Sequence, residues 1–153
     1  SRGDLDRALA AYEESLQVRR RLLERDPDRS EWLRDLSVSL DNVGDVHRSR
    51  GDLDRALAAY EESLQVVRRL LERDPDRSQW LRDLSLILDR TGDVYEKRGN
   101  LDRALITYEE SLEVKRSLSR TNPERTEWLV RISAIQGKLN DIRSRMSGWK
   151  AKA

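Results

Sequence analysis

Two pairs of aspartates are the residues of this chain whose type and spacing best suit binding chemistry. Asp41 with Asp45 and Asp89 with Asp93 are each four residues apart, and Asp141 repeats part of the pattern. Residues four apart share a helix face, so each pair holds two like charges together at a cost of roughly a few tenths of a kcal/mol. Such a face suits a basic or mixed-charge ligand. The alternative is that neighbouring arginines neutralise the aspartates and the face is simply solvated.

Residues for catalysis or for metal binding are scarce. The chain has no cysteine, and its one histidine, His47, is replaced by Tyr95 and Arg143 in the repeat described below. That exchange indicates a packing or groove-edge position, and no nucleophile and base arrangement is apparent. The glycines are isolated, so a phosphate-binding loop is missing. We expect no enzyme activity, no cofactor and no histidine or cysteine metal site; a carboxylate-only cation site stays open.

Charge is abundant but balanced. The chain has 30 Lys plus Arg and 29 Asp plus Glu, interleaved, with a net charge of +1. This balance argues against a nucleic-acid or membrane surface. No apolar run approaches the roughly 20 residues of a membrane span, and the first residues do not form a signal peptide. We expect a cytoplasmic protein, and the arginine-rich composition favours a bacterial source.

The elements that must position the aspartates recur at a fixed period. The segment GDLDRALAAYEESLQV begins at Gly3, Gly51 and, with small changes, Gly99, so the period is 48 residues. Such a period indicates an array in which each unit buries its apolar face on its neighbours. We expect one array over residues 1–153, with units 3–50, 51–98 and 99–146. Residues 3–50 and 51–98 are identical at 39 of 48 positions, which suits recent duplication or a consensus-like or de novo design.

Each unit contains two amphipathic helices. The GDL helix, named for its Gly-Asp-Leu start, is expected over residues 4–25, opened by Asp4 and closed by Pro27. The Trp helix, named for its early tryptophan, is expected to start near residues 28–30, capped by Asp28 with Glu31 or by Ser30 alone, and to run to about residue 50. The Gly51-Asp52 turn that follows is short, which implies antiparallel packing. Of the nine differences between the first two copies, eight lie between positions 31 and 49, in the Trp helix.

Glycine and tryptophan positions in the Trp helix predict close packing. Gly44 costs about 1 kcal/mol relative to alanine inside a helix, so we expect another backbone nearby, on the small face around Ala56. Trp32, Trp80 and Trp128 recur at the repeat spacing. We interpret them as packing against the end of the preceding helix, with a ligand-stacking ladder as the alternative.

The third copy differs from the first two in its Trp helix. Gln136, Asn140 and Arg143 replace Leu88, Gly92 and Tyr95. Each exchange puts a polar or larger group where the repeat has an apolar or small one. We therefore expect residues 126–146 to form a solvent-facing terminal helix and residues 147–153 to form a frayed tail.

The combined pattern resembles the tetratricopeptide repeat. Its characteristic large, glycine, aromatic, alanine and aromatic positions are occupied by Leu40, Gly44, His47, Ala56 and Tyr60, and they recur 48 residues later. The usual repeat has about 34 residues, so this one is a long-helix variant, similar to arrays of bacterial signalling proteins. The resemblance implies an all-α, antiparallel helix-hairpin solenoid with a right-handed superhelix. In the family's terms the helix order is B-A-B-A-B-A, so the first GDL helix has no partner helix before it.

The resemblance also implies a function. Arrays of this family often bind extended peptides on the concave face of their A helices, which are the Trp helices here. We expect a non-catalytic scaffold that binds a basic or mixed-charge protein or peptide and rejects acidic C-terminal tails. The alternative is a structural unit that forms homo-oligomers through the open first helix. The candidate groove residues are Arg34, Val38, Asp41, Asp45, Arg48, Arg82, Leu86, Asp89, Asp93, Glu96 and Lys97.

Overall fold

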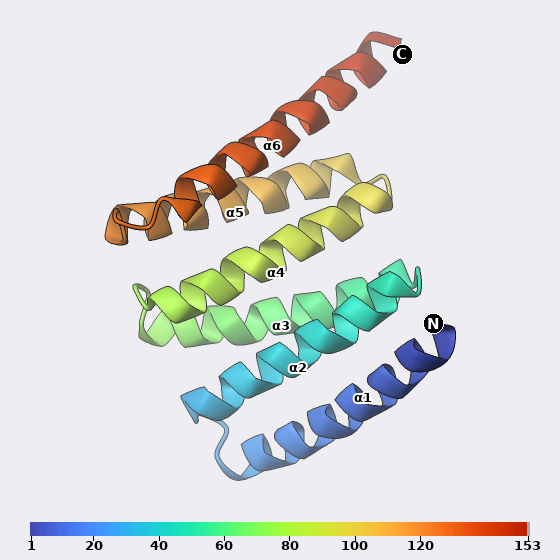
Figure 1. Cartoon of the computed structure of the whole chain (residues 1–153), viewed down its shortest axis with the longest axis vertical. Coiled ribbons are helices and arrows are strands. Elements are labelled where there is room, and N and C mark those ends of the chain that lie inside the picture. Colours follow the sequence, from blue (N-terminus) through green and yellow to red (C-terminus); the bar gives the residue numbers. More distant parts are fainter. Residues whose placement is uncertain (153) are drawn as a thin grey trace. The chain divides into compact units, whose positions relative to one another are not determined.

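The computed structural model describes residues 1–152, with side chains up to Gly148, and contains six α-helices and no strand in that range (Figure 1). The predicted all-α class and the six-helix count are therefore confirmed. The helices form two compact units, which divide between Arg77 and Ser78. The GDL and Trp helices alternate along the chain as α1 (Arg2–Arg25), α2 (Ser30–Ser49), α3 (Leu53–Arg73), α4 (Ser78–Lys97), α5 (Leu101–Thr121) and α6 (Glu127–Lys152).

Tight turns join α2 to α3 in the first unit and α4 to α5 in the second. Gly51 and Gly99 have φ values of 77° and 78° there, a left-handed backbone conformation that glycine adopts without strain. The next residues cap the GDL helices, because Asp52 and Asn100 accept hydrogen bonds from the backbone N–H groups of Arg55 and Arg103. The predicted antiparallel pairing of these helices follows from the short turns.

The predicted start of the first helix is wrong, and so are the predicted capping residues of the second, although that helix begins within the predicted range. Helix α1 begins at Arg2, because Ser1 rather than Asp4 is the N-cap and Asp4 completes a capping box with it. Helix α2 begins at Ser30 after Arg29, which makes no side-chain cap hydrogen bond. Asp28 is unavailable as a cap because it pairs with two guanidinium groups of α3, Arg69 at 2.6 Å and Arg73 at 3.1 Å.

The glycine of each of the first two Trp helices packs against a tyrosine ring of the next GDL helix. A Cβ atom on Gly44 would lie 2.5 Å from the nearest ring carbon of Tyr60, and one on Gly92 would lie 2.6 Å from Tyr108. Both tyrosines are completely buried. The close neighbour of Gly44 is therefore an aromatic side chain, one helical turn beyond Ala56, and not the backbone that the sequence analysis predicted.

The tryptophans are mainly packing residues. Trp80 and Trp128 are 3% and 2% exposed, which supports the packing interpretation over a ligand-stacking ladder. Trp32 is only half-buried, and the guanidinium group of Arg29 lies 4.4 Å from its ring centroid. His47 is buried, as expected for a packing position.

Helix α6 is longer than predicted. One side of it buries Trp128, Ile135, Leu139 and Ile142, while the exchanged residues Gln136, Asn140 and Arg143 are exposed, as expected for a terminal helix. The helix continues to Lys152, so residues 147–152 are helical and not the predicted frayed tail; Ala153 lies outside the described residues. Few residues in this stretch disfavour a helix, apart from Gly148.

The ring contacts predict opposite effects for two alanine substitutions in the second unit. Gly92→Ala is expected to lower the free energy of unfolding by up to about 2 kcal/mol, since overpacking costs about 1 to 3 kcal/mol and replacing a helical glycine by alanine stabilises by about 1 kcal/mol. Gly137→Ala is the control, because no atom lies within 4 Å of its added Cβ. It is expected to raise stability by up to about 1 kcal/mol. Urea unfolding followed by circular dichroism measures both, and a stabilised Gly92→Ala would contradict the ring contact.

Candidate peptide-binding surface

The eleven candidate residues lie on two helices in two different units. The α2 stripe consists of Arg34, Val38, Asp41, Asp45 and Arg48, and belongs to the first unit. The α4 stripe consists of Arg82, Leu86, Asp89, Asp93, Glu96 and Lys97, and belongs to the second unit. The structure thus brings the members of each stripe together on one helix, and each stripe is a candidate surface by itself.

An apolar side chain at the same repeat position is exposed in both stripes. Val38 is 39% exposed and Leu86 is 45% exposed, although both are large and hydrophobic. They are 48 residues apart and therefore occupy equivalent positions of the repeat. A charged residue lies four positions before and another three positions after each of them. This arrangement offers apolar contact beside charge.

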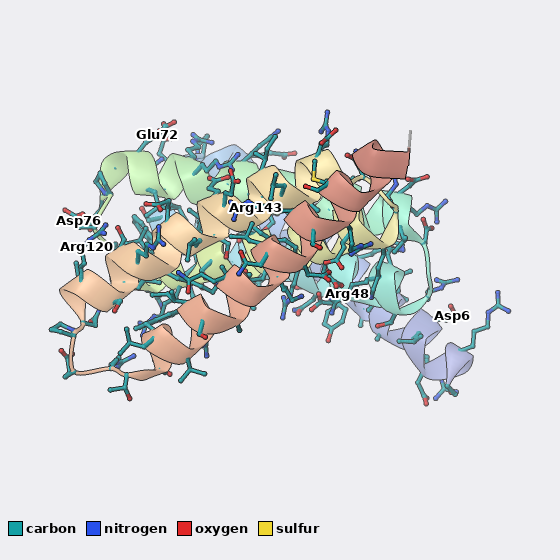
Figure 2. The ribbon with its side chains drawn as sticks, turned by 90° about the horizontal axis from the view of Figure 1, so that it is seen from above. Asp6, Arg48, Glu72, Asp76, Arg120 and Arg143 are labelled. Carbon is teal, nitrogen blue, oxygen red and sulfur yellow. The ribbon has the colours of Figure 1, made fainter. Side chains whose placement is uncertain are left out.

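The aspartates of the α2 stripe point partly into the protein. Asp41 is buried, with 8% of its surface exposed. Asp45 accepts a short hydrogen bond from the hydroxyl of Tyr60, and Arg48 approaches it to 3.9 Å. Arg48, labelled in Figure 2, is half-buried near the end of α2. The exposed charge of this stripe is therefore mixed.

In the α4 stripe every acidic residue has a cationic partner. Asp89 pairs with Lys115 at 2.7 Å, and Asp93 with Lys97 at 3.3 Å. Glu96 pairs with Arg145 of α6 at 3.0 Å and accepts a hydrogen bond from the hydroxyl of Tyr108. Both aspartates of this stripe are therefore paired with lysines, and not with the arginines that the alternative named.

Sequence analysis missed the buried Lys115. Its ammonium group donates hydrogen bonds to Asp89, to the hydroxyl of Ser85 at 2.8 Å and to that of Ser111 at 2.7 Å. The equivalent residue of the preceding copy is Val67, which is completely buried. A charged residue at a core position of the repeat was the signal that could have identified it.

Burial lowers the pKa of Lys115, against the opposing effect of Asp89. The lysine lies beside two hydroxyls, an arrangement that in principle activates a serine nucleophile. Ser111 is fully buried and Ser85 is 3% exposed, so neither hydroxyl is open to a substrate. The cluster is therefore a structural network that fastens α5 to α4.

Burial also raises the pKa of Tyr108, with the negative charges of Glu96 and Asp93 adding to the effect. The hydroxyl of Tyr108 therefore stays protonated and remains a hydrogen-bond donor to Glu96. This contact fixes one carboxylate of the α4 stripe.

Two kinds of site are not found in the described part of the chain. No group of three or more His, Cys, Asp or Glu residues within it is placed to hold a metal ion. None of its helices is both long and apolar enough to span a membrane.

The structure is that of an all-α helical-repeat protein. GDL and Trp helices alternate, glycine turns join them in pairs, and a tyrosine of one helix packs on a glycine of the other. Family models described as tetratricopeptide repeat match residues 35–117 and residues 1–28. The first match covers more than half of the chain, so this protein belongs to the tetratricopeptide repeat family. Members of this family are in general non-catalytic and bind proteins or peptides.

One solved structure agrees with this fold. The crystal structure of BtubC (BKLC) from P. vanneervenii matches with a TM-score of 0.61 and 24% identity, over 95% of this chain and 52% of that one. The present chain thus spans about half of that protein. The crystal structure of MamA matches with a TM-score of 0.34 and 16% identity, over 99% of this chain and 94% of that one. No curated protein matches the chain.

The buried lysine predicts a pH dependence of stability. In the folded chain the pKa of Lys115 lies below its ordinary value of 10.5. Between these two pKa values the unfolded chain binds more protons, so the free energy of unfolding rises with pH across that window. In urea unfolding, the wild type should therefore gain stability relative to Lys115→Met as the pH is raised toward 10.5.

Lys97→Met is the matched control, because it removes one positive charge from an exposed side chain of the same unit. If the stability difference of Lys115→Met stays constant over this pH range, burial does not lower the pKa of Lys115.

Proposed function

We propose that this chain is a scaffold whose α2 stripe and α4 stripe each bind an extended protein segment of mixed charge. The observation that carries the proposal is the exposure of Val38 and Leu86 at equivalent positions of successive Trp helices. The apolar side chains would supply affinity, and the charges around them would select the partner.

The available apolar surface sets a scale for the affinity. Complete burial of a valine or leucine side chain is worth about 1.5 to 3 kcal/mol. Leu86 is 45% exposed, so covering the rest of it would contribute roughly 1 kcal/mol. A partner therefore needs several such contacts, together with the charge pairs, to bind at micromolar strength.

The exposed charges favour a segment with both signs. Asp45 and Arg48 have side chains 30% and 29% exposed, and Asp93 and Lys97 have side chains 30% and 55% exposed. A basic side chain of the partner can approach each aspartate, and an acidic one can approach Arg48 or Lys97. Asp45 and Asp93 disfavour a terminal carboxylate, so acidic C-terminal tails are expected to be excluded.

A peptide selected on the chain from a random library tests the proposal. Its affinity, measured by isothermal titration calorimetry, is expected to fall by about tenfold or more in the double variant Val38→Asp/Leu86→Asp, because the centre of a contact carries most of its energy. Ile106→Asp is the matched control, since Ile106 is 64% exposed and lies on α5 outside both stripes. It should leave the affinity within about twofold.

Two results would contradict the proposal. One is a selected peptide that binds the double variant as well as it binds the wild type. The other is micromolar binding of a synthetic peptide that ends in several acidic residues and a free carboxylate, which would contradict the charge preference.

A further inference from the structure

Two cations of α6 lie on the acidic side of the α4 stripe. The guanidinium group of Arg145 donates a hydrogen bond of 3.0 Å to the carboxylate of Glu96. The ammonium group of Lys138 lies 3.5 Å from the hydroxyl of Tyr108 and 5.2 Å from its ring centroid. Both α4 and α6 belong to the second unit and pack against α5. Helix α6 therefore reaches the candidate surface of α4 with two positive charges.

The place that Lys138 occupies has the chemistry of a site for a basic side chain. An ammonium group within about 6 Å of the centroid of an aromatic ring is attracted by the ring. Burial raises the pKa of Tyr108, and the negative charges of Glu96 and Asp93 raise it further, so these two carboxylates of the stripe act on its hydroxyl. The ring and the carboxylates together attract a cation, and Lys138 is the cation that lies there.

The carboxylate of Glu96 is engaged at both oxygens. Its Oε1 accepts a hydrogen bond from the hydroxyl of Tyr108 at 3.4 Å, and its Oε2 accepts the one from Arg145. Arg145 also donates to Asp141 of its own helix at 3.4 Å, which holds the guanidinium group beside α4. A basic side chain of a partner therefore competes with Arg145 for Glu96.

Neither cation belongs to the core of the unit. The side chain of Arg145 is 45% exposed, and Lys138 is exposed as well. The equivalent residues of α2 are the uncharged Asn42 and Ser49, so a Trp helix forms without these charges. Exposed ion pairs contribute little to stability. Both contacts can therefore open while the unit stays folded.

We infer that Lys138 and Arg145 are a built-in competitor for the basic side chains of a partner on the α4 stripe. This inference rests on the proposed function, because it concerns the regulation of the same surface. A lysine or arginine of the bound segment takes the place of one of these cations beside Tyr108 and Glu96. The apparent affinity is then the intrinsic affinity reduced by the fraction of molecules in which that place is open.

A synthetic peptide of three Leu-Arg repeats, blocked at both ends, is the probe. Its affinity at the α4 stripe is read from the NMR signals of the Leu86 methyl groups, which separates it from binding at the α2 stripe. The double variant Lys138→Met/Arg145→Met should bind the probe about tenfold more tightly than the wild type, which corresponds to a place that is open in about one molecule in ten. Adding Glu96→Gln should remove most of this gain, because Glu96 is the carboxylate that Arg145 releases.

Arg116→Met/Arg143→Met is the matched control, because it also removes two positive charges from half-exposed side chains of the second unit. Their partners are Glu113 and Glu109, which lie outside the α4 stripe. This control should leave the affinity within about twofold, since salt screens exposed charges that do not touch the probe. Circular dichroism checks that each variant is folded.

The inference is wrong if Lys138→Met/Arg145→Met binds the probe no more tightly than the wild type, or if the probe leaves the Leu86 signals unchanged in every variant. An equal gain in the control, or a gain that survives Glu96→Gln, also contradicts it.

Failure of the proposed function gives a different result. In that case a library-selected peptide binds Val38→Asp/Leu86→Asp as well as the wild type, whatever Lys138→Met/Arg145→Met does to the probe. If the selected peptide loses affinity in Val38→Asp/Leu86→Asp while Lys138→Met/Arg145→Met shows no gain for the probe, the inference alone fails.

Discussion

A tyrosine ring packed on a glycine is the contact on which each unit of this protein depends. Tyr60 and Tyr108 are completely buried, and each fills the space that a Cβ atom would need on Gly44 or Gly92. The two helices must approach closely for this contact to form, and one register satisfies it. That register then brings together the polar pairs on the same faces, such as Ser37 with Ser63. The ring contact therefore helps to position hydrogen bonds between the Trp helix and the GDL helix that follows it.

This constraint explains where the sequence is free to change. The GDL helix contributes the tyrosine and most of the face around it, and residues 3–25 and 51–73 differ only at Arg19. The Trp helix keeps its glycine, but its exchanges fall on both faces. Val43 to Thr91 and His47 to Tyr95 are exchanges at buried positions, whereas Val38 to Leu86 is an exchange at an exposed one. A surface that varies on an invariant support is what a binding scaffold requires, because partner choice can change without loss of the fold.

The sequence predicted the features that depend on local rules and missed those that depend on distant partners. The 48-residue period, the six helices and the glycine turns follow from spacing and backbone preferences, and the structure confirms them. Asp28 is a good N-cap residue by local rules, but its carboxylate is held by Arg69 and Arg73, more than forty residues away. The candidate residues lie along one helix in each unit, and their role in binding stays a prediction. The burial of Asp41 and the pairing of Asp89 with Lys115 could not be predicted from the sequence, because both depend on how the next helix packs.

One repeat position differs in charge among the three GDL helices. It holds Arg19 in α1, Val67 in α3 and Lys115 in α5. A buried ion pair adds little net stability, because the loss of hydration of both charges opposes their attraction. The ion pair instead affects which helix can pack against α5. A lysine enclosed in a core is costly without a carboxylate, so α5 favours a helix with an aspartate at the position of Asp89 over a helix without one. Val67 imposes no such requirement on α2. Lys115 thus requires an aspartate on the helix that α5 packs against, while the tyrosine and glycine set how closely the two helices pack.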